Sequence, residues 1–254
     1  MKEKLSVWKI YRNAYKYLVS HLFAFAFLTI FYFIGSVLPV LVGISSGFLF
    51  DIFTTVYIFT FLYIASGCYF KQQLLFDKKV FIASGIRFFT AIALFLIALL
   101  VASFVINIVI SFINISFGMD FVNLMLGSYI WLFCKYLFIL FLFVTFFLVP
   151  SFAFVSEING KNKSLLVTFA KTKGNLFRIC GVVLIAFLLL LFVMFLMSYV
   201  NVVVASLLRS IILVYISLLY FKMYDFFYIF HQQHKMTKIK KLFSKKEELN
   251  VDER

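Results

Sequence analysis

Long apolar stretches alternate with short polar segments along almost the whole chain. A helix that crosses a bilayer needs about 20 predominantly apolar residues, because each residue advances the helix by about 1.5 Å. Six stretches reach that length, which predicts an all-α, polytopic membrane protein whose six transmembrane helices form three hairpins. They are residues 18–42, 52–70, 88–113, 124–149, 176–200 and 202–221.

Some ends of these helices are less well defined by the pattern. The fourth helix can begin as late as Trp131, and the sixth can instead occupy residues 210–230. A tight turn near Asn201 is expected, since the fifth and sixth stretches are nearly continuous. Pro39 is expected to kink or end the first helix, and Pro150 to mark the end of the fourth, because proline lacks the N–H that a helix interior needs.

A basic segment that leads straight into an apolar helix stands out at residues 164–183, SLLVTFAKTKGNLFRICGVV. Gly174 is predicted to stop the short first helix, and Asn175 to cap the next one. Within that short helix four apolar side chains group together, namely Leu165, Leu166, Phe169 and Ala170. Weaker versions of this arrangement occur at residues 7–23 and 79–94, which suggests three repeated units of an interfacial element and a hairpin. The alternative is that any six-helix protein with its basic loops on one side has this layout.

The N-terminal segment, residues 5–17, is predicted to form an amphipathic helix that lies along the membrane surface. At 100° per residue, its polar face carries Lys9, Arg12, Asn13 and Lys16. The opposite face carries Val7, Ile10, Tyr11, Ala14 and Leu18. Residues 77–87, in contrast, are too short and irregular to predict a separate helix.

The charges follow the same alternation. Of the 24 lysines and arginines, 22 fall before the first helix, in alternate loops, or after the sixth helix. The positive-inside rule therefore predicts that the N- and C-termini are both cytoplasmic. Because the first apolar stretch is as long as a full span, it is expected to remain as an uncleaved anchor.

The composition agrees with a membrane location. Hydrophobic residues make up 65% of the chain and charged residues 13%, whereas a soluble domain has about 25% charged residues. The net charge of +14 is best explained by orientation and by anionic lipid, since the basic residues flank apolar helices. No nucleic-acid partner is expected. The three cysteines are isolated, so neither a disulfide framework nor a zinc site is indicated.

Two cations fall outside the basic loops, Lys135 in the fourth helix and Arg209 in the sixth. A charge in the bilayer centre costs about 2.5–3.5 kcal/mol on insertion scales, so each needs an explanation. One interpretation is a shared pocket for an anionic head group or solute, with Asn107 as a further contact. The other is that both side chains reach the membrane surface and are solvated there.

Six basic residues near helix entrances are the candidate contacts to inner-leaflet lipid, namely Lys9, Arg12, Lys16, Lys171, Lys173 and Arg178. His231 and His234, with Asp225 upstream, have a spacing that two metal ligands can use, but a solvated histidine pair is the preferred interpretation. The sequence contains none of the phosphate-binding, nucleophile or metal motifs of the common enzyme classes. It therefore predicts neither a catalytic site nor a cofactor.

Residues 150–191, PSFAFVSEINGKNKSLLVTFAKTKGNLFRICGVVLIAFLLLL, carry a resemblance to a known family. A proline near a helix end is followed by an acidic residue, a polar turn, an amphipathic segment, and Lys-Gly-Asn opening the next span. This order resembles the membrane domain attached to some glycerophosphodiester phosphodiesterases and the related YciC-like inner-membrane proteins. The resemblance implies a six-helix fold and, without the soluble phosphodiesterase domain, no such activity.

The sequence thus predicts a six-helix transmembrane domain at residues 1–230 and a basic-to-acidic cytoplasmic tail at residues 231–254. The expected function is non-catalytic and concerns membrane lipids, as a lipid-handling or envelope-maintaining protein that contacts anionic lipid. A small transporter for an anionic solute or lipid is one alternative. Another is a membrane subunit whose tail, from residue 235 on, docks a cytoplasmic protein.

Overall fold

A computed structural model describes residues 4–41, 47–71, 77–119, 126–160, 164–197 and 202–230. Within these ranges all the regular elements are helical. They are α1 (Val7–Ser20), α2 (Leu22–Leu41), α3 (Phe48–Lys71), α4 (Lys78–Phe117), α6 (Tyr129–Phe143), the π-helical η1 (Val144–Leu148), α7 (Val149–Ile158), α8 (Leu165–Thr172), α9 (Leu176–Met197), α10 (Val202–Asp225) and the π-helical η2 (Phe226–Phe230). Asn201 and the tail at residues 231–254 lie outside the described part of the chain.

Six helical segments are long and apolar enough to cross a membrane, which confirms the predicted all-α polytopic fold. They lie in α2, α3, α4, the continuous α6–η1–α7 segment, α9 and α10. Their outward-facing side chains are largely apolar, as the exposed Leu100, Phe104 and Phe112 of α4 illustrate. Such surfaces are compatible with lipid, whereas water would disfavour so large an apolar area.

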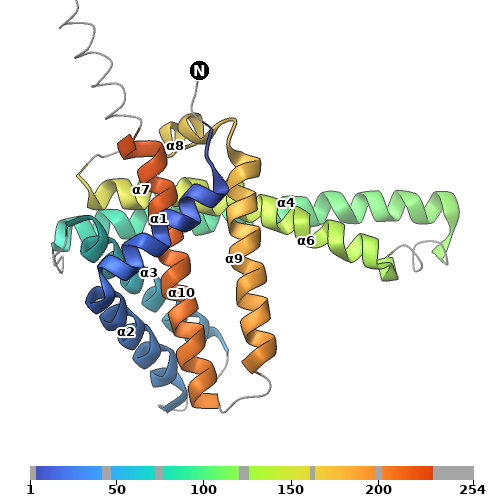
Figure 1. The fold of residues 1–254 in the computed structure, drawn as a ribbon. Coiled ribbons are helices and arrows are strands. Elements are labelled where there is room, and N and C mark those ends of the chain that lie inside the picture. The colour runs from blue at the N-terminus through green and yellow to red at the C-terminus, as the bar shows by residue number, and fades with distance from the viewer. Residues whose placement is uncertain are drawn as a thin grey trace, which may run out of the picture.

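The helices form a body and a projecting arm (Figure 1). The body contains α2, α3, α9 and α10, while α4 and α6 run side by side across the direction of α9 and α10 and extend beyond the body. Short helices α1 and α8 lie at the end of the body where α10 finishes and α9 begins. The arm is anchored because α7 packs against both α4 and α8.

The core lies where α7 meets the end of α10. Nine of the ten residues of α7 are buried. Phe152 stacks on Tyr220 with ring centroids 5.3 Å apart, and Tyr224 stacks on Tyr228 at 4.6 Å. An ion pair of 2.7 Å between Arg87 and Glu157 links α4 to α7 beside this core. Aromatic packing and one charge pair therefore join the arm to the body.

The α1 helix has the predicted faces. Ile10 and Ala14 are buried, while Lys9, Arg12, Asn13 and Lys16 are exposed. The buried face packs against α10, α9 and α2, so it is covered by protein. A break at His21 separates α1 from α2, which begins four residues later than the predicted first span.

Two expectations about helix boundaries were wrong. The third span was expected to begin at residue 88, whereas residues 78–87 are helical as the beginning of the 40-residue α4. Its N-terminus is capped by the Asp77 side chain, which accepts hydrogen bonds from the N–H groups of Lys79 and Val80. Pro150 does not end the fourth span, which continues as α7 to Ile158. The π-helical turn η1 precedes the proline, and the Val149 N–H donates to the Val144 carbonyl five residues back. This wider turn changes the hydrogen-bond pattern at the place where a proline disturbs a regular α-helix.

The sequence pattern left open where the fourth helix begins and which residues form the sixth helix. The α6 helix begins at Tyr129, capped by Ser128, close to the later of the predicted starts. The α10 helix begins at Val202 and continues through η2 to Phe230. Gly174 has a φ of +87° directly after α8, which confirms it as the residue that stops this helix.

The apolar grouping predicted for α8 does not form its buried face. Thr168 and Thr172 are buried, whereas Leu166 and Ala170 are exposed. The threonine hydroxyls donate within the helix, to the carbonyls of Leu165 and Thr168, and so need no outside partner. The short helix thus packs through its threonines and the half-buried Phe169, and it leaves Leu166 and Ala170 on the surface.

Candidate functional site

An open pocket lies between α1, the end of α3 and the end of α10. Its volume is about 440 Å³. Polar and cationic groups on its wall come from Lys9 and Asn13 of α1 and from Lys222 and Asp225 of α10. Apolar side chains complete the wall, namely Ile10, Phe70 and Phe226. We refer to this cavity as the α1/α10 pocket.

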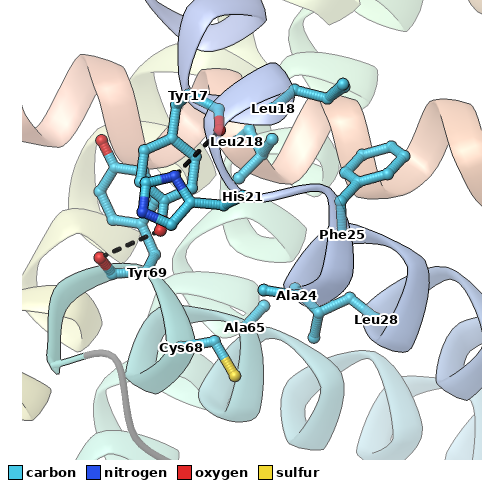
Figure 2. Close-up of a pocket in the computed structure, with 10 residues that line it drawn as sticks. All are labelled: Tyr17, Leu18, His21, Ala24, Phe25, Leu28, Ala65, Cys68, Tyr69 and Leu218. Atoms are coloured by element: carbon cyan, nitrogen blue, oxygen red, sulfur yellow. Dashed lines mark hydrogen bonds between the residues drawn. The ribbon is translucent and has the colours of Figure 1, made fainter.

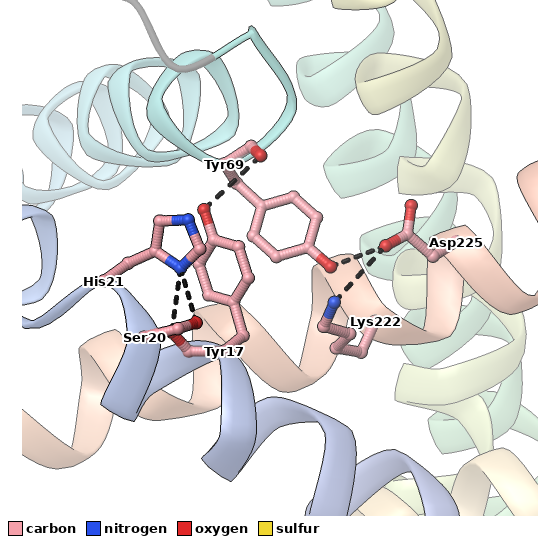
Figure 3. Close-up of polar contacts among 6 residues, drawn as sticks. All are labelled: Tyr17, Ser20, His21, Tyr69, Lys222 and Asp225. Atoms are coloured by element: carbon pink, nitrogen blue, oxygen red, sulfur yellow. Dashed lines mark hydrogen bonds and ion pairs between the residues drawn. The ribbon is translucent and has the colours of Figure 1, made fainter.

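A compact polar network forms the inner wall of the α1/α10 pocket (Figure 3). The Tyr69 hydroxyl donates to Asp225 Oδ2 at 2.5 Å, and Lys222 Nζ lies 3.7 Å from the same oxygen. The ammonium group also lies over two aromatic rings, 4.9 Å from the centroid of Tyr17 and 4.8 Å from that of Tyr69. Ring faces attract cations, so Lys222 is held by both tyrosines as well as by the carboxylate.

The break between α1 and α2 places the His21 ring behind this wall, against Tyr17. The His21 ring stacks on Tyr17 with centroids 4.1 Å apart, and its Nδ1 atom lies 2.8 Å from the Ser20 hydroxyl. Below them, a narrow crevice between α1, α2 and α3 is lined by Ala24, Ala65 and Cys68 (Figure 2). Its volume of about 10 Å³ is at the lower limit for one water molecule. The α1/α10 pocket is therefore closed on this side.

Burial raises the pKa of the Tyr17 hydroxyl above its ordinary value, with smaller contributions from Cys68 and from the charge on Asp225. Tyr17 is consequently neutral throughout the physiological pH range. Its hydroxyl lies 3.4 Å from the Tyr69 carbonyl oxygen and donates to it. Tyr17 thus positions the pocket wall and carries no charge of its own.

The chemistry of the α1/α10 pocket favours an anionic group. Lys9 and Lys222 supply two positive charges, Asn13 supplies an amide, and Asp225 supplies one negative charge that is already engaged by Tyr69 and Lys222. Because the Lys222–Asp225 contact is long for a charge-assisted hydrogen bond, the ammonium group keeps donor capacity for a further oxygen. A phosphate group, with several acceptor oxygens, matches this set of donors.

The structure does not bring the three predicted anion contacts together. Asn107 and Lys135 lie on α4 and α6, the helices of the arm, whereas Arg209 lies on α10 of the body (Figure 1). All three are exposed, and none lines the α1/α10 pocket. Lys135 lies in the second turn of α6, near the helix start, whereas Arg209 lies two turns inside α10.

The predicted inner-leaflet contacts fall into two groups. Lys9, Arg12, Lys16 and Lys173 are exposed at the α1 and α8 end of the body. Lys171 instead lies over the ring of Tyr228, 4.3 Å from its centroid, and Arg178 is half-buried. Both have protein partners in addition to any lipid that they contact.

Arg178 and Asn175 hold the start of the described chain. Arg178 Nη1 donates to the Leu5 carbonyl at 2.7 Å, and the Leu5 N–H donates to Asn175 Oδ1 at 2.9 Å. The Leu5 side chain is only 1% exposed. We call these two hydrogen bonds the Leu5 clamp. Asn175 also occupies the predicted cap position of α9, because its backbone carbonyl accepts hydrogen bonds from the N–H groups of Arg178 and Ile179. Its side chain, however, accepts the hydrogen bond from Leu5.

The spacing of Asp225, His231 and His234 prompted a metal interpretation, and both histidines lie outside the described residues. Asp225 itself contacts Tyr69 and Lys222. Among the described residues, no group of three or more histidine, cysteine, aspartate or glutamate side chains is placed to hold a metal ion.

Comparisons with known protein families, curated proteins and solved structures find no match. The fold therefore defines the class to which the chain belongs: it is a multi-pass, all-α membrane protein whose described residues include six helices capable of spanning a bilayer. The resemblance of residues 150–191 to the phosphodiesterase-associated membrane domain stays a prediction.

Sequence reasoning missed the Tyr17, Tyr69 and Lys222 part of the site. Tyr69 and Asp225 are separated by 156 positions, so no local pattern joins them. One signal was present: Lys222 and Asp225 are three residues apart, which places opposite charges on one helix face at the end of an apolar span.

Proposed function

We propose that this protein is a non-catalytic membrane protein that binds an anionic phospholipid head group in the α1/α10 pocket. The observation that carries the proposal is the convergence of Lys9, Asn13 and Lys222 on one open cavity of about 440 Å³. The lining is mixed, since apolar side chains adjoin the cations. A head group with its glycerol and upper acyl chains has the same mixture of charge and apolar surface.

The surroundings of the pocket favour a lipid over a soluble anion. Trp8 and Tyr15 are 78% and 63% exposed on α1, next to its lysines. Exposed tryptophan and tyrosine beside lysine are typical of helices at a membrane surface, because their rings lie at the level of the head groups. Leu166 of α8 and Phe177 of α9 add exposed apolar side chains at the same end.

The role of such a site is the handling of lipid or the maintenance of the envelope of a bacterial inner membrane. The family resemblance supports this proposal, because the residues that carry it, from α7 to the start of α9, build the Leu5 clamp and thereby hold α1, one wall of the pocket. The exposed lysines of α1, and the exposed Lys173 just after α8, then add contacts to neighbouring anionic lipids.

Lipid binding is tested by native mass spectrometry of the protein with phosphatidylglycerol. Lys9→Gln is expected to weaken binding about tenfold or more, because it removes a charged donor from the pocket and a hydrogen bond to a charged group contributes about 1.5–3 kcal/mol. Lys16→Gln is the matched control, since Lys16 is an exposed lysine of the same helix that does not line the pocket. Zwitterionic phosphatidylcholine is expected to bind weakly to all three proteins.

Three outcomes bear on this proposal. Equal losses in the Lys9 and Lys16 variants would assign lipid binding to general surface charge and contradict a defined pocket. If millimolar inorganic phosphate displaces phosphatidylglycerol and also binds the protein when no lipid is present, the ligand is a soluble anion. Selective loss in Lys9→Gln, with no competition by phosphate, supports a lipid site.

We also propose that the α1 and α8 end faces the cytoplasm, which is supported by the one-sided distribution of basic residues. Single cysteines test it, in a chain whose own Cys68, Cys134 and Cys180 are replaced by serine. They are Lys173→Cys at this end and Tyr129→Cys at the start of α6, both at exposed positions. In intact cells an impermeant maleimide is expected to label Tyr129→Cys, whereas Lys173→Cys is labelled only after permeabilisation. The reverse pattern, or equal labelling of both, would contradict the orientation.

A further inference from the structure

A second cavity, partly open to the surface, lies where the arm meets the body. Its volume is about 170 Å³, and its wall is contributed by α3, α4, α6, η1, α7, α9 and α10. Three aromatic rings face it from the arm, those of Phe88, Phe143 and Phe147. Val183 and Ala186 of α9 form part of the opposite wall. We call this space the arm cavity.

The few polar groups on the wall of the arm cavity are already paired. The Ser151 hydroxyl donates to the Leu148 carbonyl at 2.8 Å, and the Ser217 hydroxyl donates to the Leu213 carbonyl at 2.9 Å. The Tyr220 hydroxyl lies 3.0 Å from the Ser151 oxygen, to which it donates because the serine proton is already used. All three hydroxyl protons that face the cavity are therefore committed to protein oxygens.

This arrangement disfavours water as the occupant. A buried water needs two to four polar partners, including acceptors for its own protons and donors to its oxygen. The wall offers no free hydroxyl proton, and its other side chains are apolar. In another protein, a cavity of about 150 Å³ lined by Leu, Ile and Phe stays dry and binds benzene or xenon. The arm cavity has a similar size and lining.

We infer that the arm cavity is a binding site for a narrow, linear apolar group, and that its occupant is the end of a lipid acyl chain. The helices around it are long and apolar enough to span a bilayer, so acyl chains are the apolar groups present at the highest concentration. The π-helical turn η1 contributes Phe147 and Leu148 to the wall, and such turns often occur at functional sites. This inference is independent of the α1/α10 pocket, which lies on other residues of α10.

Crystals of the full chain exposed to xenon test the cavity. An anomalous xenon peak is expected between Phe147 and Ala186. Ala186→Leu should remove the peak, because the larger side chain occupies the space, and Ala186→Val should reduce it if the leucine variant does not fold. The crystals are grown from protein purified free of lipid, because a bound acyl chain would exclude xenon. Absence of both xenon and acyl-chain density in the wild-type cavity, or an unchanged peak in a folded Ala186→Leu variant, would overturn the site.

A second crystal grown with phosphatidylcholine brominated at the acyl-chain ends identifies the occupant. Anomalous bromine density in the arm cavity is the expected result, and Ala186→Leu should abolish that density as well. Xenon density without bromine density would overturn the acyl chain as the occupant, because it would show a cavity that lipid does not enter.

Discussion

Replacing Phe152 with alanine is expected to lower the free energy of unfolding by about 3–5 kcal/mol, the usual cost of removing a fully buried phenylalanine. Phe152 is 0% exposed, and its ring packs on Tyr220, Tyr224, Phe227 and Tyr228. These contacts link α7 to α10 and η2. The loss should appear as a lower midpoint of chemical or thermal unfolding in detergent.

Phe177→Ala is the matched control for Phe152→Ala, because Phe177 is 84% exposed on α9. Its replacement should change the free energy of unfolding by no more than about 0.5 kcal/mol, as is usual for surface substitutions. If the two variants unfold at the same midpoint, the α7–α10 contact is not the core of the fold.

Removing the Leu5 clamp should release α1. Arg178→Ala loses a hydrogen bond from a charged group, a type that contributes about 1.5–3 kcal/mol. The expected result is faster hydrogen exchange in α1 by about one to two orders of magnitude, since α1 would open without unfolding the body. Asn175→Ala, which removes the side-chain oxygen that accepts the Leu5 N–H hydrogen bond, should act in the same direction.

Lys173→Ala serves as the control for the clamp, because Lys173 is a basic and exposed neighbour. Its α1 amides should exchange as in the wild-type protein. Equal acceleration in the Lys173 and Arg178 variants would mean that charge at this end, and not the hydrogen bond to Leu5, holds α1. Tyr11, whose hydroxyl donates to the Val182 carbonyl at 2.8 Å, should retain part of the α1–α9 contact in every variant.

Much of the architecture was predictable because it depends on local pattern. Spans of apolar residues mark the six helices, and the glycine at position 174 marks the end of α8 through its positive φ. The amphipathic spacing in α1 correctly predicted that Ile10 and Ala14 share its apolar face, but this face packs on other helices of the protein. These features are determined within a few turns of helix, where sequence distance and spatial distance correspond.

The errors concern features that depend on neighbours distant in sequence or on uncommon helical geometry. The helical start of α4 was missed because its residues continue the following span and do not form a separate amphipathic segment. Pro150 was taken as a helix end because a regular α-helix disfavours proline, yet a π-helical turn precedes it. The α1/α10 pocket needs α1, α3 and α10 together, so its Tyr69–Asp225 contact had no counterpart in the local pattern.

The same distinction explains the outcome for the predicted cations. Lys135, Arg209 and Asn107 were grouped because they share the outer half of a simple six-helix layout. The arm, which carries Lys135 and Asn107, runs across the direction of α10, which carries Arg209 (Figure 1). This arrangement separates Lys135 and Asn107 from Arg209. A crossing of this kind depends on how α7 packs, which hydropathy does not report.

The central claim, an anionic lipid head group in the α1/α10 pocket, is tested most directly by an experimental structure in nanodiscs that contain phosphatidylglycerol. The account predicts phosphate density within contact distance of Lys9 and Lys222, with glycerol density toward Ile10 and Phe226. An ordered anionic lipid bound elsewhere, with the α1/α10 pocket holding only water, would contradict it.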